Sequence, residues 1–276
     1  MLQQRDEVDL TGFVDMHVHS APDVRPRKLD DVEVARAAAQ TGMAGVLIKS
    51  HVTITADRAA VAERVVRGTR VFGGIALNHA VGGLNPAAVQ AALGLGARQV
   101  WLPTFSARGN SDSPDGITVL DEAGELRPVV REIIRLVADA DAILGTGHLS
   151  VPEIALVVKE ARRLGLKKVL ITHPESHLVA MPVSVQRELA QLGAWFERCY
   201  VETLGPSASL GVPDLARQIR AVGPASTVIS TDLGQEGNPA PVDGFRDYVA
   251  GLLANGVSWA EVRLMAVDNP SRLLGL

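Results

Sequence analysis

The chain has little of what several classes of protein require. A single cysteine among 276 residues excludes a disulfide framework and any cysteine-rich zinc module, and it suits a reducing compartment. No stretch reaches the roughly 18 uninterrupted apolar residues of a membrane helix, and the start, MLQQRDEVDL, lacks the apolar segment of a secretory signal. Lysine and arginine form no runs and the net charge is −4, which argues against a nucleic-acid or anionic membrane surface. We therefore expect a cytoplasmic protein that acts on a small molecule, and the sequence leaves homo-oligomers open.

The chain does contain a repeat of short apolar runs that alternate with helical patterns. Eight runs of about five to eight residues have the composition of parallel strands buried on both faces. They cover residues 12–18, 44–50, 70–77, 98–103, 142–147, 168–172, 197–202 and 226–231. Between them, Ser150 and Glu153 form a capping box before a helix over 151–164, and Asn85-Pro86 opens another helix.

Eight strand–helix units in succession predict a (β/α)8 TIM barrel, in which residues 1–276 form a single domain. The one long interval between strands holds residues 105–127, a polar segment with a possible small hairpin around 122–124. We expect this segment to be a loop insertion after the fourth strand. An open doubly wound sheet is the alternative, but no glycine-rich dinucleotide fingerprint follows the first strand.

Histidines gather at the ends of the predicted strands. Six of the seven lie at or just past the carboxyl end of a strand: His17, His19, His51, His79, His148 and His173. In a barrel these ends form one face, so we expect the six to converge. His17 and His19 share one face of their strand because side chains alternate, and two neutral imidazoles so placed can ligate one metal ion. Asp15 is expected beside them as a partner of a ligand.

Three more candidate ligands end later strands. His148 ends the fifth strand, His173 the sixth and Asp232 the eighth. They add two imidazoles and a carboxylate to the same rim. Asp232 can bind an ion and also take a proton from a metal-activated water, although an aspartate at this place is also typical of a helix N-cap.

These residues give the sequence a resemblance to the amidohydrolase superfamily of metal-dependent hydrolases. The matching residues, in strand order, are His17, His19, His148, His173 and Asp232, and residues 268–276 resemble the closing helix of many members. The resemblance implies a (β/α)8 barrel with one or two divalent ions, zinc first and manganese or iron as alternatives. It implies that His17, His19, His148 and Asp232 are ligands. It also implies that His173 holds a second ion or the substrate, and that Asp232 shuttles the proton.

The sequence departs from binuclear members of that superfamily at the fourth strand. Those members carry a carboxylated lysine or a glutamate there, whereas this chain reads Trp101-Leu-Pro-Thr104. Either the site is mononuclear, or Lys49 at the end of the second strand is a carbamylated bridge or a substrate contact with a catalytic role. A lysine at the end of a buried strand is costly unless it is paired, and the alternative is a solvated side chain.

Three groups near the rim are candidates for substrate binding: His51, Arg25 and Asn78. His51 shares a face with Lys49 because the two are separated by one residue on a strand. The guanidinium of Arg25 suits a carboxylate or phosphate. Asn78 either orients a substrate carbonyl or is a turn residue. Glu202, which ends the predicted seventh strand, is a further acid or base.

Together these residues predict an enzyme that uses metal-activated water on a small, polar, anionic substrate. A cyclic amide, amide, ester or lactone is the expected class of substrate. A mononuclear non-oxidative decarboxylase of the same superfamily is the first alternative. A phosphoesterase and a non-catalytic binding barrel are the others, because a fold does not fix a reaction.

Overall fold

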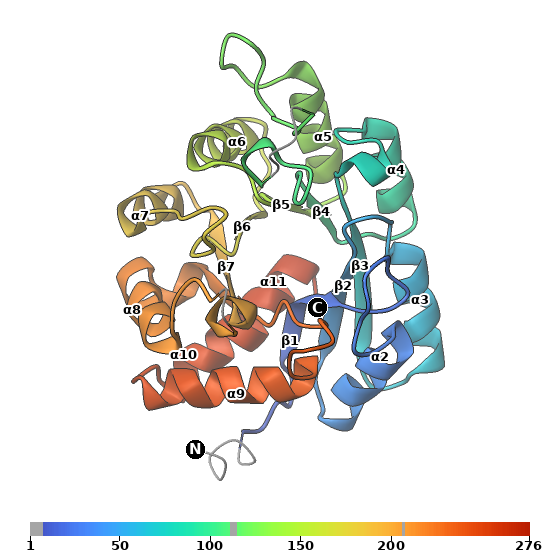
Figure 1. Cartoon of the computed structure of the whole chain (residues 1–276), viewed down its shortest axis with the longest axis vertical. Coiled ribbons are helices and arrows are strands. Elements are labelled where there is room, and N and C mark those ends of the chain that lie inside the picture. The colour runs from blue at the N-terminus through green and yellow to red at the C-terminus, as the bar shows by residue number, and fades with distance from the viewer. Residues whose placement is uncertain (1–7, 111–114, 206–207) are drawn as a thin grey trace.

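The computed structural model describes residues 8–110, 115–205 and 208–276. Eight strands form one sheet in the order β1 to β8, and each strand pairs in parallel with the next. The strands are β1 (Val14–His19), β2 (Gly45–Lys49), β3 (Arg70–Ala76), β4 (Gln99–Trp101), β5 (Ile143–Gly145), β6 (Val169–Thr172), β7 (Trp195–Cys199) and β8 (Thr227–Ser230). Figure 1 shows the strands as a ring inside a circle of helices.

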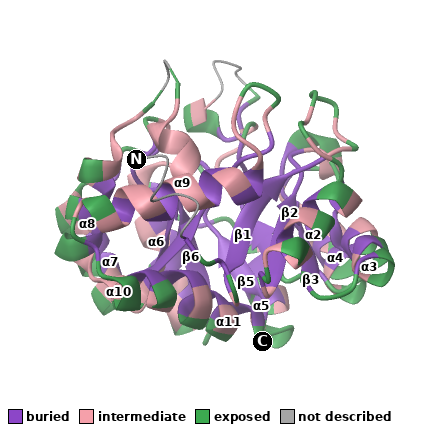
Figure 2. Cartoon of the chain, turned by 90° about the horizontal axis from the view of Figure 1, so that it is seen from below, coloured by how far each residue is buried: buried purple, intermediate pink, exposed green. Residues whose placement is uncertain are grey.

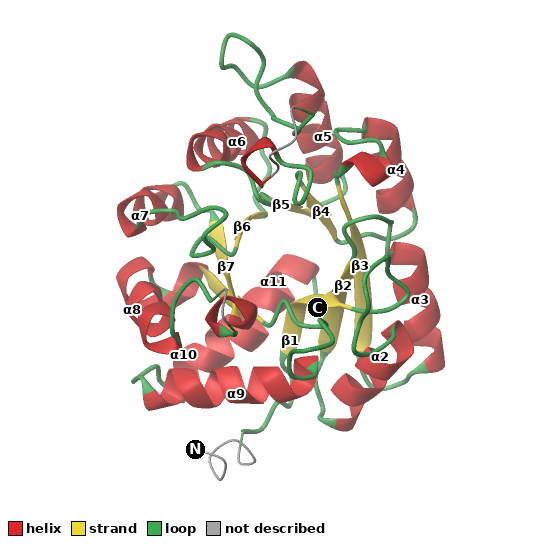
Figure 3. Cartoon of the chain, in the orientation of Figure 1, coloured by secondary structure: helices red, strands yellow, loops and turns green. Residues whose placement is uncertain are grey.

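An α-helix follows every strand, so the predicted (β/α)8 barrel is confirmed (Figure 3). The helices are α2 (Asp31–Gln40), α3 (Ala56–Val65), α4 (Pro86–Gly94), α5 (Pro128–Asp139), α6 (Val151–Arg163), α7 (Val183–Gln191), α8 (Val212–Val222), α9 (Pro241–Ala254), α10 (Trp259–Arg263) and α11 (Asn269–Leu274). The side chain of Asn85 caps α4, as the sequence predicts. None of the helices among the described residues combines the length and apolar character needed to cross a membrane.

The predicted seventh strand is wrong at both ends. The strand runs over Trp195–Cys199, and Tyr200–Thr203 forms a 3-10 turn instead of continuing it. The physical reason is that Glu197 and Arg198 are both charged and both fully buried. A search for runs of apolar residues misses such a strand, because ionisable residues are normally exposed and are taken to mark the end of a buried strand.

Apolar side chains fill the barrel and the space between the sheet and its helices. Figure 2 shows that the strands are buried and that exposed residues lie mainly on the surrounding helices and loops. Two large clusters lie between strands and helices, and a third lies among residues of the strands themselves. Leu273 and Leu274 of α11 belong to this third cluster, together with Val14 and Met16 of β1. The last helix therefore packs against the interior of the barrel.

Trp101, at the end of β4, is fully buried in the barrel cluster. Glycines on both neighbouring strands make room for its ring. A Cβ atom at Gly74 of β3 would lie 2.6 Å from the indole, and one at Gly145 of β5 would lie 2.5 Å from it. The end of the fourth strand is thus filled by an indole that only its two glycine neighbours permit.

The segment 105–127 is an insertion after β4, as predicted. Leu120 and Leu126 form an antiparallel bridge around a turn at 121–124, which agrees with the hairpin expected there. Residues 111–114 of this segment lie outside the described residues. Glu153 of α6 accepts hydrogen bonds from Thr118 and from the backbone N–H of Val119, and with its other oxygen from Ser150. One carboxylate therefore anchors the insertion and the start of α6.

The barrel closes along a short seam between β1 and β8. The N–H of Asp232 donates to the carbonyl of His17 at 2.8 Å, and the N–H of His19 donates to the carbonyl of Leu233 at 2.7 Å. Gly234 (φ 133°) follows at once, and any Cβ there would lie 1.8 Å from the carbonyl oxygen of His19. This close approach requires glycine and draws Asp232 against the end of β1.

Asp15 strengthens this seam and does not contact a histidine ring. Its two carboxylate oxygens accept hydrogen bonds from the N–H and the hydroxyl of Thr231, at 3.0 and 2.6 Å. The register shifts between Asp15 and Val18, where three steps along β1 match two along β2. This irregularity breaks the simple alternation that led us to expect Asp15 on the face of His17 and His19.

We predict that Asp15 makes the stability of the fold fall as the pH rises from about 4 to 7. Burial raises the pKa of Asp15 from 3.8 to about 7, against the hydrogen bonds from Thr231 that lower it. In that range the folded chain holds a proton that the unfolded chain releases, so the free energy of unfolding falls by up to ~1.4 kcal/mol per pH unit. Urea unfolding at pH 5 and pH 7 should show a shallower fall for Asp15→Asn. The exposed Asp141→Asn variant is the control, and an equal fall in all three proteins would contradict this assignment.

Candidate metal centre

Five of the seven histidines meet at the carboxyl ends of the strands. The ring centroids of His17 and His19 are 5.3 Å apart, those of His19 and His51 4.8 Å, and those of His148 and His173 4.9 Å. The rings of His17 and His173 lie 6.3 Å apart and link the two groups. The remaining two stand apart: His79 is exposed and reaches the carbonyl of Asp115, and His177 contacts Ser209.

Three donor atoms converge within this group. Nε2 of His17 and Nε2 of His19 lie 3.2 and 3.1 Å from the same oxygen of Asp232, Oδ1. Two ligands bound to one zinc ion in a tetrahedral site are separated by roughly 3.3 Å. Burial acts to raise the pKa of Asp232, but its contacts with His17 and His19 and the charge of Lys49 outweigh burial and hold the pKa well below 3.8. Asp232 is therefore a carboxylate at neutral pH.

The hydrogen bonds of His19 show that these atoms fit a cation. Nδ1 of His19 lies 3.0 Å from the carbonyl oxygen of Lys49, which can only accept, so Nδ1 carries the proton. Burial lowers the pKa of His19, so the ring is neutral and Nε2 holds a bare lone pair. That lone pair faces the carboxylate of Asp232. Two electron-rich atoms at 3.1 Å repel each other unless a cation lies between them.

Glu197 is a site residue that the sequence analysis does not identify. It lies on β7, is fully buried, and its Oε2 is 3.2 Å from Nδ1 of His17, while its Oε1 accepts from Ser230. Burial raises the pKa of Glu197 to about 8, although the charge of Lys49 lowers it. An ion on Nε2 of His17 leaves the ring proton on Nδ1 and so favours the carboxylate form. A carboxylate behind a ligating histidine is a recurring arrangement in metal sites.

His148 and His173 border the three donor atoms without joining their group. Among the described residues, the groups of metal-ligand type include His17, His19 and Asp232, or His17, Glu197 and Cys199. His173 adopts a left-handed backbone (φ 26°), and its Nδ1 is buried without a hydrogen-bond partner in the described part of the chain. An imidazole held in this way has a free nitrogen for a ligand.

Lys49 and His51 face the same group from β2 and the loop after it. Lys49 is 1% exposed, and its Nζ lies 2.9 Å from Nε2 of His17. Burial lowers the pKa of Lys49, although the charges of Asp232 and Glu197 oppose this. The lysine is therefore inside the site and not a solvated side chain. His51 stacks on His19, and its Nδ1 is 2.8 Å from the hydroxyl of Thr104.

Asn78 is buried, and its side chain links the loops around the site by hydrogen bonds. Its amide nitrogen donates to the carbonyl of His51 and to the hydroxyl of Thr104, at 2.9 and 2.6 Å. Its oxygen accepts from the N–H groups of Thr104 and Ser106. All four of these bonds join the loops after β2, β3 and β4. The structure thus gives Asn78 a role in holding His51.

Arg25 lies at the entrance to the site. Its guanidinium carbon is 4.3 Å from the centre of the Phe105 ring, and Phe105 also stacks on His51 with a centroid distance of 3.8 Å. Arg25 is exposed, whereas the neighbouring Arg27 is bound to Asp23. Glu202, expected as an acid or base, accepts from Ser209 in the turn after β7.

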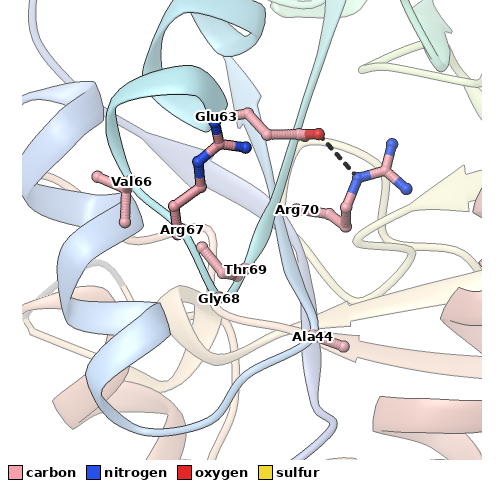
Figure 4. A pocket seen from close by; sticks show the side chains of 7 residues that line it. All are labelled: Ala44, Glu63, Val66, Arg67, Gly68, Thr69 and Arg70. Carbon is pink, nitrogen blue, oxygen red and sulfur yellow. Dashed lines mark hydrogen bonds and ion pairs between the residues drawn. The ribbon is translucent and has the colours of Figure 1, made fainter.

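A pocket in another part of the molecule has no part in this centre. It has a volume of about 320 Å³ and lies beside the start of β3, where Glu63 binds Arg70 at 2.9 Å (Figure 4). The remaining lining residues are Ala44, Val66, Arg67, Gly68 and Thr69. None of the histidines of the centre lines it.

Comparison with known proteins supports the fold and identifies a family of unknown function. The model of this family (DUF6282) matches residues 12–197. A comparison with curated proteins finds no match.

Solved structures of several enzymes share the whole fold. One is an amidohydrolase from Pseudomonas aeruginosa, with a TM-score of 0.68 at 14% identity over 99% of this chain and 97% of that one. Another is the probable dipeptidase PvdM from Pseudomonas aeruginosa, with a TM-score of 0.67 at 11% identity over 99% and 97%. A third is a 2,6-dihydroxybenzoate decarboxylase, with a TM-score of 0.59 at 14% identity over 96% and 100%. The chain thus shares its fold with these three enzymes.

We predict that Glu197→Ala weakens zinc binding by about 10- to 100-fold, because Nδ1 of His17 loses the partner that fixes the ring. Cys199→Ala is a matched control, since its sulfur lies on the same strand 3.8 Å from the same nitrogen. Titration of the metal-free proteins with zinc against a competing chelator measures both affinities. A Glu197→Ala variant that binds zinc as tightly as the wild-type chain would show that Glu197 does not act through His17.

Proposed function

The chain belongs to a family of unknown function, DUF6282, and from this premise and the geometry of its site we propose that it is a metal-dependent hydrolase. The convergence of His17, His19 and Asp232 on one point carries the proposal. The superfamily fold of the structural neighbours is consistent with it. We further propose zinc as the ion and the cytoplasm as the location.

His17, His19 and Asp232 would hold the ion, and the free nitrogen of His173 and the ring of His148 are the next ligands in reach. When bound, a divalent ion polarises a substrate oxygen and activates water as a nucleophile. Neutral imidazoles suit this task, and burial lowers the pKa of His17 and His148 well below 6.5. Each ring therefore stays neutral at neutral pH, with a lone pair on one of its two nitrogens.

Asp232 is the residue of the centre that is best placed to move a proton. Its side chain is 12% exposed, whereas those of His17 and His19 are 0% and 3% exposed. A carboxylate that is partly exposed at the opening of the barrel, at the carboxyl ends of the strands (the mouth), can take a proton from water and return it to the leaving group.

The cations around the mouth favour an anionic substrate. Lys49 lies inside the site and Arg25 at its entrance, and His51 stacks between His19 and Phe105. A small polar molecule with a carboxylate and a hydrolysable cyclic amide, amide, ester or lactone bond would satisfy both the ligands and these cations.

A mononuclear decarboxylase is the second candidate, and Trp101 favours it. The indole fills the end of β4, where binuclear members of the superfamily carry a bridging group. In that reaction Lys49 or Arg25 would hold the departing carboxylate. Release of carbon dioxide from a substrate carboxylate separates this reaction from hydrolysis, in which no carbon is lost.

We predict that the purified chain retains at least one equivalent of a divalent ion when neither chelator nor metal-affinity capture is used. A His17→Ala/His19→Ala double variant should lose it, because two of the three converging donors are removed. Elemental analysis measures the ratio. A wild-type chain that stays free of metal after zinc and manganese are offered would overturn the proposal.

We also predict that Asp232→Asn lowers turnover by about 100-fold or more, in the range typical of losing a general acid or base. The amide keeps the shape and one oxygen but cannot take up the proton. Assays at saturating zinc, with metal content checked, separate this effect from loss of the ion. Glu236→Asn, in the loop after β8, is the control, and unchanged turnover with metal in place would contradict the assignment of Asp232.

A further inference from the structure

The ammonium group of Lys49 and an ion of the proposed centre require the same atom. Nζ of Lys49 lies 2.9 Å from Nε2 of His17, and this same Nε2 faces Asp232 at 3.2 Å. In a neutral imidazole, Nε2 has a single position in the ring plane, which holds either a lone pair or a hydrogen. The hydrogen bond with Lys49 fills that position in both cases, because either the amine donates to the lone pair or the ring N–H donates to the amine.

The surroundings of Lys49 show why it adopts this contact. The side chain is fully buried, and Trp101 lies beside it, with Nζ 5.3 Å from the centre of the ring. Within residues 8–110, 115–205 and 208–276, Nζ forms no ion pair with a carboxylate. His17 is thus the near partner that satisfies a buried amine, and the charges of Asp232 and Glu197 act from further away.

The ring of His17 and the backbone of Lys49 are both held independently of this contact. Glu197 binds the opposite nitrogen of His17, at 3.2 Å. The carbonyl of Lys49 is bound by Nδ1 of His19, and Lys49 pairs with His19 in the sheet. Breaking the contact between Lys49 and His17 therefore requires a rotation of the lysine side chain alone.

We propose that Lys49 and the metal ion exchange at Nε2 of His17: the lysine occupies this nitrogen in the metal-free chain, and ion binding releases its amine into the mouth. The inference rests on the proposed function, since it takes His17 as a ligand of the ion. The released amine becomes the cation that meets the anionic group of the substrate. The site thereby completes its substrate-binding side only when its ion is present.

The test compares metal affinities. Metal-free wild-type chain and Lys49→Leu are titrated with Mn2+ and Zn2+, because leucine offers neither a donor nor a ligand atom. We expect Lys49→Leu to bind the ion at least 10-fold more tightly, since no competitor is left on His17. Arg27→Leu is the control for charge alone, because Nη2 of Arg27 lies 3.4 Å from Nδ1 of His19 and does not contact Nε2 of His17. We expect it to change the affinity less than 3-fold.

Several outcomes overturn the exchange. Equal affinity of Lys49→Leu and wild type would show that the amine does not compete, and weaker binding would show that Lys49 is itself a ligand or a carbamylated bridge. An equal gain in Arg27→Leu would assign the effect to charge. Failure of every variant and of wild type to bind any ion would overturn the proposed metal centre, which is a different result.

A second measurement keeps the test independent of folding in the leucine variant. Lys49→Gln is titrated beside it, and we expect tighter binding because its shorter side chain cannot reach Nε2 as the lysine does. In the wild-type chain, the nitrogen-15 signal of the Lys49 amine should shift as one equivalent of Zn2+ is added. An unmoved signal at full occupancy would contradict the release of Lys49.

Discussion

The seam between β1 and β8 is the constraint on which the rest of the site depends. Asp232 belongs to the last strand unit and His17 and His19 to the first, so their donor atoms meet only where the sheet closes on itself. Two backbone hydrogen bonds and the carboxylate of Asp15 close it. The glycine at position 234 allows the two strand ends to touch. A barrel that closed one residue out of register would separate the ligands and turn their side chains to the wrong face.

Burial governs the electrostatics of the centre. It keeps the imidazoles neutral, because a protonated ring would lose its hydration. Burial also acts to raise the pKa of Asp232, but the contacts with His17 and His19 and the charge of Lys49 keep this carboxylate ionised. The result is a set of bare nitrogen and oxygen atoms that face one another out of water. Without a cation this arrangement lowers the stability of the fold. The residues that would bind the ion therefore destabilise the metal-free chain. The contact of Lys49 with His17 relieves part of this conflict in the metal-free chain.

The fold and the histidine cluster were accessible from the sequence because they follow from simple periodicities. Eight apolar runs at a regular spacing predict the barrel, and the position of His148 and His173 at strand ends places them at one rim. Glu197 was not accessible in this way, since it sits inside a strand whose two central residues are charged and paired with buried partners. The sequence signal for Glu197 was a pair of adjacent charged residues, Glu197 and Arg198, in a segment that is otherwise typical of a buried strand. Asp15 was misplaced because an irregular register in β1 cannot be read from the order of residues.

The packing of Trp101 between Gly74 and Gly145 has a consequence for how this barrel can change over evolution. A carboxylate cannot replace the indole by one substitution without leaving an empty space in the interior, and a larger residue cannot replace either glycine while the indole remains. Position 145 is therefore coupled to position 101, whereas Gly74 is also required by the backbone oxygen of Gln99, which a Cβ atom there would approach to 2.2 Å. A single substitution at the end of β4 is therefore disfavoured. Substitutions in the loops after the strands can change the reaction without disturbing this packing.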